Sequence, residues 1–270
     1  MKKTDLRRGF LIDIEGVLVR DKRYEPIAGA VPWLRALREA GTPFCLVSNN
    51  TTHRPAELIG DLVAAGFPVT EDHLVGALDL GRRWLQERGR RRIMWLGTAD
   101  LATYWAEMGF ELVTGGACEA VVLGANAELS VGELDQALGA VLEQGADVVC
   151  LHRNPFFLDA EGQRRLGPGA WAAALEAVGG TGAVITVGKP SEKIYNEAIK
   201  RIGVAPAEAL FISDDPVNDL VTAGQLGMTT AFVLSGKHPD HEILGRLAEE
   251  DWPDIICNSL ADLERPADCS

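Results

Sequence analysis

The first apolar run of the 270-residue chain, residues 9–12, ends abruptly in Asp13, and Glu15 and Gly16 follow at once. An ionised carboxylate at the end of a core strand costs free energy unless a positive group pairs with it. We therefore interpret Asp13 as a functional group whose partners lie elsewhere in the chain. The alternative is that Asp13 only ends a strand and that Glu15-Gly16 forms an ordinary turn.

Three further apolar runs end in polar residues that could complement Asp13. These residues are Ser48, Asn49 and Asn50 after the run 44–47, Lys189 after the run 183–187, and Asp214, Asp215 and Asp219 after the run 209–212. If the four runs are neighbouring strands of one parallel sheet, their carboxyl ends meet at one edge. Clustered carboxylates repel one another without a cation, and ligation by oxygen alone suits Mg²⁺.

Together these side chains predict phosphoryl transfer through an aspartyl-phosphate. Asp13 would be the nucleophile, a role that carboxylates take with phosphate esters. Glu15 would be the general acid that protonates the leaving oxygen and then the base that activates water. Lys189 would neutralise charge on Asp13 and on the transferring phosphoryl group. Because Lys189 precedes Pro190, its alternative is a solvated position at the start of a helix.

The turn after the run 44–47 would bind the phosphoryl oxygens of the substrate. The Ser48 hydroxyl and the Asn49 backbone N–H suit an anion site at a strand-to-helix turn. Asn50 continues the same amide-rich turn and is a third candidate for substrate binding. All three are also ordinary turn residues, which is the alternative interpretation.

The acidic residues after the run 209–212 would bind the metal. Asp214 would hold Mg²⁺, and Asp215 or Asp219 would be a second carboxylate at or behind the ion. Each of the latter two could instead cap or favour the start of the following helix. The choice between Asp215 and Asp219 stays open at this point.

Apolar periodicity predicts the elements that would position these residues. A strand at 9–12, a helix at 31–40 and a strand at 44–47 begin an alternating pattern that resumes after residue 185. A second alternation of strands and helices occupies residues 80–184. We therefore predict an α/β protein with a core domain of residues 1–79 and 185–270, interrupted by an inserted α/β cap domain of residues 80–184.

At these residues the sequence resembles the haloacid dehalogenase (HAD) superfamily of phosphatases. Its four motifs match residues 13–18, 47–50, 188–191 and 213–219, in order and spread across the core. A cap of about a hundred residues between the second and third motifs resembles subclass IIA, which includes the p-nitrophenyl phosphatases. Residues 187–191 are typical of that subclass. The segments 152–157 and 166–169 are most similar to the phospholysine, phosphohistidine and inorganic pyrophosphate phosphatase branch.

The resemblance implies a Rossmann-like core with a cap of the subclass IIA type and dependence on Mg²⁺. It implies metal ligation by Asp13, by the backbone carbonyl of Glu15 and by Asp214. Two residues depart from the family pattern: Glu15 stands where the family usually has Asp, and Ser213 where it usually has Gly. Glutamate is one methylene longer, so we expect altered specificity or rate rather than loss of activity. The sequence predicts no consequence for Ser213.

Candidate specificity residues lie in the predicted cap. Asn154, Phe156, Phe157 and Arg165 belong to a loop that could cover the site and sequester the reaction. The alternative is that the two phenylalanines pack the interior of the cap. His152, at the end of a predicted strand, is interpreted as structural.

Composition limits the partners. With 39 acidic and 26 basic residues the net charge is −13, which argues against a nucleic-acid partner. The chain has no apolar run of membrane-spanning length and no apolar segment near residue 1, so no membrane partner and a cytoplasmic protein are expected. The five cysteines are scattered and indicate neither a disulfide framework nor a zinc site.

The sequence therefore predicts an enzyme that hydrolyses a small phosphorylated metabolite. Two alternatives stay open: a phosphoamidase or inorganic pyrophosphatase, and a catalytically silent phosphate-ligand-binding protein, which Glu15 would allow. The resemblance also implies a homodimer formed through the cap.

Overall fold

The computed structural model describes residues 8–20, 23–158, 163–179 and 184–263. Contacts divide the chain into two compact units. The core unit comprises Met1–Ser48, Ala56–Val75 and Glu192–Ser270, and the second unit comprises Asn49–Pro55 and Gly76–Ser191. The second unit thus begins and ends outside the predicted range 80–184 and also takes residues 49–55.

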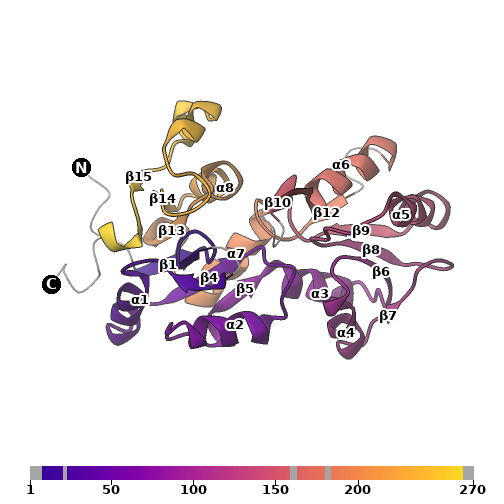
Figure 1. Cartoon of the computed structure of the whole chain (residues 1–270), viewed down its shortest axis with the longest axis horizontal. Coiled ribbons are helices and arrows are strands. Elements are labelled where there is room, and N and C mark those ends of the chain that lie inside the picture. The colour runs from indigo at the N-terminus through magenta and orange to yellow at the C-terminus, as the bar shows by residue number, and fades with distance from the viewer. Residues whose placement is uncertain (1–7, 21–22, 159–162, 180–183, 264–270) are drawn as a thin grey trace. The chain divides into compact units, whose positions relative to one another are not determined.

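The core unit is built on a six-stranded sheet in the order β15-β14-β13-β1-β4-β5 (Figure 1). Its strands are β1 (Gly9–Ile12), β4 (Phe44–Ser48), β5 (Leu74–Gly76), β13 (Ala209–Ser213), β14 (Thr229–Val233) and β15 (Ile255–Cys257). β1 runs parallel to both neighbours, with Ile12 opposite Ile212 of β13 and Leu46 of β4. All residues of β1, β4 and β13 are buried, as expected of parallel strands that are covered on both faces.

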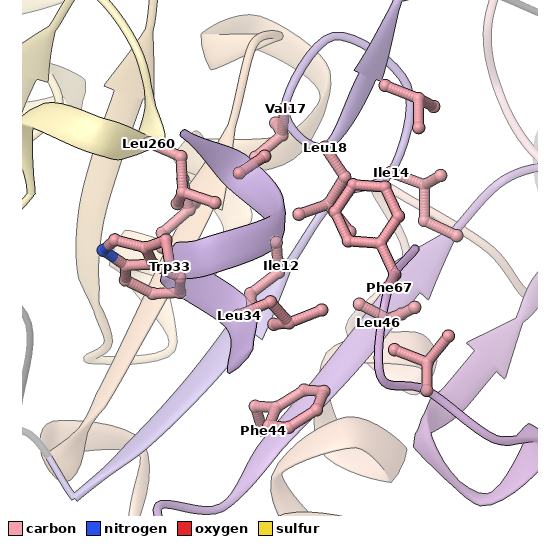
Figure 2. Close-up of a cluster of buried hydrophobic side chains, with 14 of the residues drawn as sticks. Ile12, Ile14, Val17, Leu18, Trp33, Leu34, Phe44, Leu46, Phe67 and Leu260 are labelled. Carbon is pink, nitrogen blue, oxygen red and sulfur yellow. The ribbon is translucent and has the colours of Figure 1, made fainter. Parts of the chain in front are cut away.

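Helices cover both faces of the core sheet. α1 (Ala30–Glu39) and α2 (Pro55–Ala64) lie on one face, where Trp33 and Leu34 pack with Ile12 and Leu46 (Figure 2). α7 (Glu192–Ile202) and α8 (Val221–Gln225) lie on the other face. There the ring of Tyr195 meets Phe211 edge-on at 5.5 Å between centroids. The central strands are therefore fixed from both sides, which holds their carboxyl ends in place.

The second unit has its own five-stranded parallel sheet in the order β12-β9-β8-β6-β7. Its strands are β6 (Arg92–Leu96), β7 (Glu111–Leu112), β8 (Ala120–Leu123), β9 (Asp147–Cys150) and β12 (Val184–Thr186). Ala183, predicted as the first residue of β12, lies outside the described residues. α3 (Ala77–Glu87) and α4 (Asp100–Glu107) pack on one face, and α5 (Val131–Gln144) and α6 (Pro168–Gly179) on the other.

Short elements complete the two units. Two antiparallel hairpins pair β2 (Val19–Arg20) with β3 (Glu25–Pro26), and β10 (Phe156–Leu158) with β11 (Arg164–Leu166). A π-helical turn, Pro216–Leu220, precedes α8. Short 3-10 turns span Glu71–His73, Pro206–Glu208, Glu242–Arg246, Glu249–Asp251 and Leu260–Asp262. The predicted α/β architecture with a parallel-sheet core is confirmed. Within the described ranges no helix is long and apolar enough to cross a membrane.

Candidate active site

The carboxyl ends of three adjacent core strands bring candidate residues to one edge of the sheet. Asp13 follows β1, and its N–H donates to the carbonyl of Ile212 in β13 at 2.9 Å. Ser213 ends β13 and is followed by Asp214, and Ser48 ends β4 on the other side of β1. Ser48 and Ser213 are the last residues of their strands, so the sheet sets their positions. Asp13 and Asp214 each follow a strand directly.

Asp13 is a buried carboxylate, with 7% of its surface exposed. Its Oδ1 accepts the N–H of Ile14 at 2.9 Å, so the side chain turns back toward its own backbone. The chain then makes a tight turn in which the N–H groups of Val17, Leu18 and Val19 converge on the carbonyl of Ile14. Glu15 lies in this turn, half-buried, directly after the predicted nucleophile.

Ser213 joins two of the predicted acidic residues. Its hydroxyl donates to Asp219 Oδ2 at 2.6 Å and lies 3.4 Å from Asp13 Oδ2. The same oxygen accepts the N–H of Asp215 at 3.1 Å. Asp219 is buried and its backbone carbonyl accepts the Tyr195 hydroxyl at 2.9 Å. Asp13 and Asp219, far apart in the sequence, therefore face one hydroxyl group.

The negative charge of this region is reflected in Tyr195. Burial, followed by the charges of Asp219, Asp13 and Asp215, raises the pKa of Tyr195 well above its usual value of 10. The phenol is thus a neutral donor at all ordinary pH values. Several carboxylates that act on one buried phenol lie close enough to repel one another, which favours a bound cation.

Asp214 is held in a cradle of backbone. Its Oδ2 accepts the N–H of Lys237 at 2.6 Å. A Cβ at Gly16 or at Gly236 would lie 2.0 Å from that oxygen, so neither position has room for a side chain. Gly16 also has φ of +82°, a conformation that favours glycine. Two glycines and one backbone N–H therefore set the direction of the Asp214 carboxylate.

Asp215 is a capping residue. Its Oδ1 accepts the N–H of Asn218 at 3.1 Å, while its Oδ2 accepts the Asn218 amide at 2.8 Å and pairs with Lys237 Nζ at 2.7 Å. Burial raises the pKa of Asp215, but the Lys237 charge and the hydrogen bonds from Lys237 and Asn218 outweigh it and leave the pKa below its usual value. Both carboxylate oxygens are thus engaged at the start of the π-helical turn.

The donor set of the core unit fits a magnesium ion. Among the described residues, no three or more His, Cys, Asp and Glu side chains are grouped so that they could hold a metal ion. Mg²⁺ is usually held by one or two carboxylates, with water and substrate oxygens completing its shell. The buried carboxylates of Asp13, Asp214 and Asp219 supply oxygen ligands of that kind.

Lys189 belongs to the second unit: the strand before it, β12, pairs with β9 and is not part of the core sheet, so the expected grouping of all four runs in one sheet is wrong for this run. Lys189 is 2% exposed. The side-chain amide of Asn49 binds its backbone in both directions: Asn49 Nδ2 donates to the Lys189 carbonyl at 3.1 Å, and the Lys189 N–H donates to Asn49 Oδ1 at 2.8 Å. A Cβ at Gly188 would lie 2.3 Å from the Leu151 carbonyl and 2.6 Å from Asn49 Oδ1. Asn49 and Gly188 therefore position the lysine.

His152 is a neutral, buried residue of the second unit. Burial, and then the charge of Lys189, lowers the pKa of His152 to about 3. Its Nδ1 accepts the N–H of Asn154 at 3.4 Å, so Nε2 carries the proton and faces Thr51 Oγ1 at 3.5 Å. Thr51 Oγ1 also accepts the N–H of Ala125 at 3.0 Å. These contacts place His152 in a structural network, as its position at a strand end suggested.

The other two amide candidates support turns. Asn50 Oδ1 accepts the N–H groups of Thr52 and His53, each at 3.0 Å. The Asn154 carbonyl accepts the N–H of Gly169 at 3.1 Å, next to the start of α6. Their roles in substrate binding stay predictions.

Gly236 and Lys237, which follow β14, are not among the residues predicted for the site. Gly236 leaves room for Asp214 because it has no side chain, and Lys237 acts through its backbone N–H, so residue type alone does not reveal either role. Their position in the sequence could have revealed these roles, since Ser235-Gly236-Lys237 is a polar segment directly after an apolar run, as at the four predicted strand ends. The Ser235 hydroxyl donates to the Gly16 carbonyl at 2.7 Å and fixes this segment to the turn after Asp13.

Two family models match the chain. A model described as haloacid dehalogenase-like hydrolase matches residues 10–111, and one described as HAD-hydrolase-like matches residues 186–263, so that together they span more than half of the sequence. The chain belongs to the haloacid dehalogenase-like hydrolases. The family assignment made from the four motifs is confirmed, and with it the prediction that the protein is an enzyme of the hydrolase class.

Relatives of this hydrolase match along most of its length. Human haloacid dehalogenase-like hydrolase domain-containing protein 2 is 29% identical over 86% of this chain and 85% of its own. Rat chronophin is 28% identical over 95% of this chain and 86% of its own. The p-nitrophenyl phosphatase from Archaeoglobus fulgidus is 29% identical, covers 95% of this chain and 97% of its own, and has a TM-score of 0.82. Similarity to subclass IIA is thereby confirmed, and the phospholysine and phosphohistidine branch stays a prediction.

Proposed function

We propose that this hydrolase is a Mg²⁺-dependent phosphatase that cleaves a small phosphomonoester through an aspartyl-phosphate on Asp13. The observation that carries the proposal is the buried Asp13 carboxylate at the end of the central strand, with Ser48 and Asp214 at the ends of the two neighbouring strands. Similarity to a p-nitrophenyl phosphatase along nearly the whole chain supports the same chemistry.

In the first half-reaction a carboxylate oxygen of Asp13 attacks phosphorus. The new bond joins Asp13 to the phosphoryl group, the bond from phosphorus to the alcohol oxygen breaks, and Glu15 gives its proton to that oxygen. Glu15 follows Asp13 by two residues in the tight turn after β1, so the acid and the nucleophile are fixed by one short segment.

In the second half-reaction water attacks the phosphorus of the aspartyl-phosphate. Glu15, now ionised, takes a proton from this water, and the bond between Asp13 and phosphorus breaks. The products are inorganic phosphate and the regenerated Asp13 carboxylate. Glutamate is one methylene longer than the aspartate that the family usually has at this position, which changes where the proton is delivered. We therefore infer that Glu15 affects which leaving groups are accepted.

Charge and orientation come from the other strand ends. The Ser48 hydroxyl and the Asn49 N–H would bind phosphoryl oxygens, while the Asn49 side chain keeps the Lys189 backbone in place. Lys189 would then neutralise charge on the phosphoryl group and on Asp13. The candidate contact of Asn154 with the substrate belongs to the same proposal.

The metal would be held by Asp13, Asp214 and the Glu15 carbonyl, with Asp219 as a further carboxylate at or behind the ion. Bound there, Mg²⁺ supplies positive charge that lets acidic side chains and a phosphate dianion share one site. We favour Asp219 over Asp215, because both oxygens of Asp215 are engaged by Asn218 and Lys237.

The test is hydrolysis of p-nitrophenyl phosphate by the full chain with Mg²⁺, with EDTA, and with the Asp13→Asn variant. We expect turnover with Mg²⁺, none with EDTA, and a loss of at least about a thousandfold in kcat for Asp13→Asn. Asp254→Asn is the matched control, since Asp254 is a carboxylate that binds Thr230 at the amino end of β14. Turnover that survives Asp13→Asn would exclude the mechanism.

Assays with other substrates, and a measurement of phosphate binding, separate the alternatives. Faster hydrolysis of phospholysine, phosphohistidine or pyrophosphate than of any phosphomonoester would show a phosphoamidase or pyrophosphatase. Binding of phosphate without turnover at any metal would show a silent phosphate-binding protein. Dimerisation through the cap and the cellular compartment stay predictions from the sequence.

A further inference from the structure

Ser213 occupies a position whose effect the sequence does not predict. Its side chain is fully buried at the end of β13, and its hydroxyl has one proton for two carboxylates. The 2.6 Å distance to Asp219 Oδ2 is that of a charge-assisted hydrogen bond, while 3.4 Å to Asp13 Oδ2 is not. The proton therefore belongs to the bond with Asp219.

The acceptor side of the hydroxyl is also fixed. The N–H of Asp215 donates to the Ser213 oxygen at 3.1 Å, which leaves the hydroxyl little freedom to rotate. The backbone of Asp219 is held as well, because its carbonyl accepts a hydrogen bond from the Tyr195 hydroxyl. The Asp219 carboxylate is thus held by the Ser213 hydroxyl, whose oxygen lies 3.4 Å from Asp13 Oδ2.

We propose that Ser213 is a positioning residue that holds the Asp219 charge beside Asp13 and thereby strengthens binding of the divalent cation. The inference rests on the proposed metal-assisted phosphatase chemistry. Without the hydroxyl, Asp219 is a buried carboxylate that has lost a charge-assisted donor. Its side chain is then no longer held in place and can turn away, which removes negative charge from the cation site.

The experiment is calorimetric titration of the full chain with Mg²⁺, in the absence of any substrate. We expect Ser213→Ala to raise the Mg²⁺ dissociation constant about tenfold or more, because hydrogen bonds to charged groups contribute at that level. Ser213→Thr keeps a hydroxyl and is expected to restore affinity to within about threefold of the wild type. If the extra methyl group prevents folding, Ser213→Cys, a weaker donor, is expected to give an intermediate affinity.

A double-mutant cycle separates positioning from general damage. Asp219→Asn removes the charge that Ser213 holds, so Ser213→Ala should weaken Mg²⁺ binding little further in that background. Thr230→Val is the matched control: Thr230 is also a buried hydroxyl that binds a carboxylate, Asp254, but at the opposite end of the neighbouring strand. This variant should lose stability and keep the wild-type Mg²⁺ affinity.

The outcomes are distinct. Unchanged Mg²⁺ binding in Ser213→Ala, or additive losses in the double variant, would overturn the role of Ser213 while the proposed function stands. Absence of Mg²⁺ binding by the wild-type chain would overturn both the proposed function and this inference. A tenfold loss that Asp219→Asn abolishes, with rescue by Ser213→Thr, supports it.

Discussion

The two units contain parallel sheets of similar size, but they differ in the residues that come directly after the strands. In the core, buried polar groups follow the central strands, among them Asp13 after β1 and Asp214 after β13. In the second unit, Gly97 follows β6 and Gly124 follows β8, and both lie against the ring of Trp95. A Cβ would approach that ring to 1.8 Å at Gly97 and 2.3 Å at Gly124.

The carboxyl ends of the central strands are therefore followed by charged residues in the core unit, whereas the carboxyl ends of β6 and β8 in the second unit are covered by an indole. The second unit also places polar residues after strands: burial keeps His152 neutral, while Lys189, whose backbone is held by Asn49, belongs to the proposed active site. The comparison shows that the fold supplies positions, whereas a few side chains at strand ends decide whether a position becomes an active site.

The glycines at the two edges provide the largest expected contrast. Gly236→Ala places a Cβ 2.0 Å from Asp214 Oδ2 and 2.5 Å from the Gly16 backbone, so the carboxylate must move. We expect a fall of at least about a hundredfold in kcat/KM, since small displacements of catalytic groups have effects of that size. The measurement is steady-state hydrolysis of p-nitrophenyl phosphate by the folded variant.

Gly124→Ala is the counterpart in the second unit. Its Cβ would meet the Trp95 ring, so we expect a loss of stability of about 1–3 kcal/mol with kcat of the folded protein nearly unchanged. Urea unfolding followed by tryptophan fluorescence gives the stability. If Gly236→Ala kept full activity, the cradle around Asp214 would have no catalytic importance.

His152 gives the second contrast, through pH. Its pKa is about 3 in the folded chain and about 6.5 in the unfolded chain, so the unfolded state binds more protons between these values. The stability of the second unit should therefore fall as pH drops below 6.5, by at most about 1.4 kcal/mol per pH unit, until about pH 3. Hydrogen exchange of β9 amides measures this slope.

A His152→Gln variant tests the assignment. It lacks the titrating group, so the difference in stability between pH 7 and pH 5 should be smaller than in the wild type. An equal slope in the two proteins would show that His152 is not the source of the pH dependence.

The smallest expected effect concerns the Lys237 side chain. Lys237→Met removes the ion pair with Asp215 but leaves the backbone N–H that holds Asp214. Because Lys237 is partly exposed, we expect a loss of about 1 kcal/mol at pH 7 and activity within a few-fold of the wild type.

The acid dependence of that loss has a definite sign. The pKa of Asp215 is lowered in the folded chain, so its contribution is present above the unfolded value near 4 and is lost as pH falls through the folded value. The difference between Lys237→Met and the wild type should shrink below about pH 4. A loss of activity as large as that of Gly236→Ala would instead place the Lys237 side chain in the mechanism.

The parts of the fold that periodicity predicts are the long or fully apolar ones. β1 matches its predicted range and α1 lies within one residue of its predicted range, because a buried strand and an amphipathic helix each leave a clear pattern. α3 is not predicted as a separate element, although Leu78, Trp84 and Leu85 have helical spacing, because the predicted cap boundary at residue 80 divides it. β7 and the strands of the two hairpins are only two or three residues long, which is too short to show an alternation of apolar and polar residues.

The candidate site was predictable to the extent that residue type carries the chemistry. Carboxylates and a lysine after apolar runs indicate a site, and the structure places Asp13, Ser48 and Asp214 at adjacent strand ends. The roles of Gly236 and Ser213 depend on three-dimensional contacts that residue type does not encode. Asp219 meets the Ser213 hydroxyl only because a π-helical turn brings it back toward β13.

The central claim is that Asp13 forms the covalent bond to phosphorus, and trapping that bond tests it most directly. The wild-type chain would be mixed with p-nitrophenyl phosphate and Mg²⁺, quenched during turnover, treated with borohydride, and digested for mass spectrometry. Borohydride reduces an acyl phosphate to an alcohol, so we predict reduction at residue 13 that requires both substrate and Mg²⁺. Normal turnover with Asp13 unmodified, or with reduction at another carboxylate, would contradict the account.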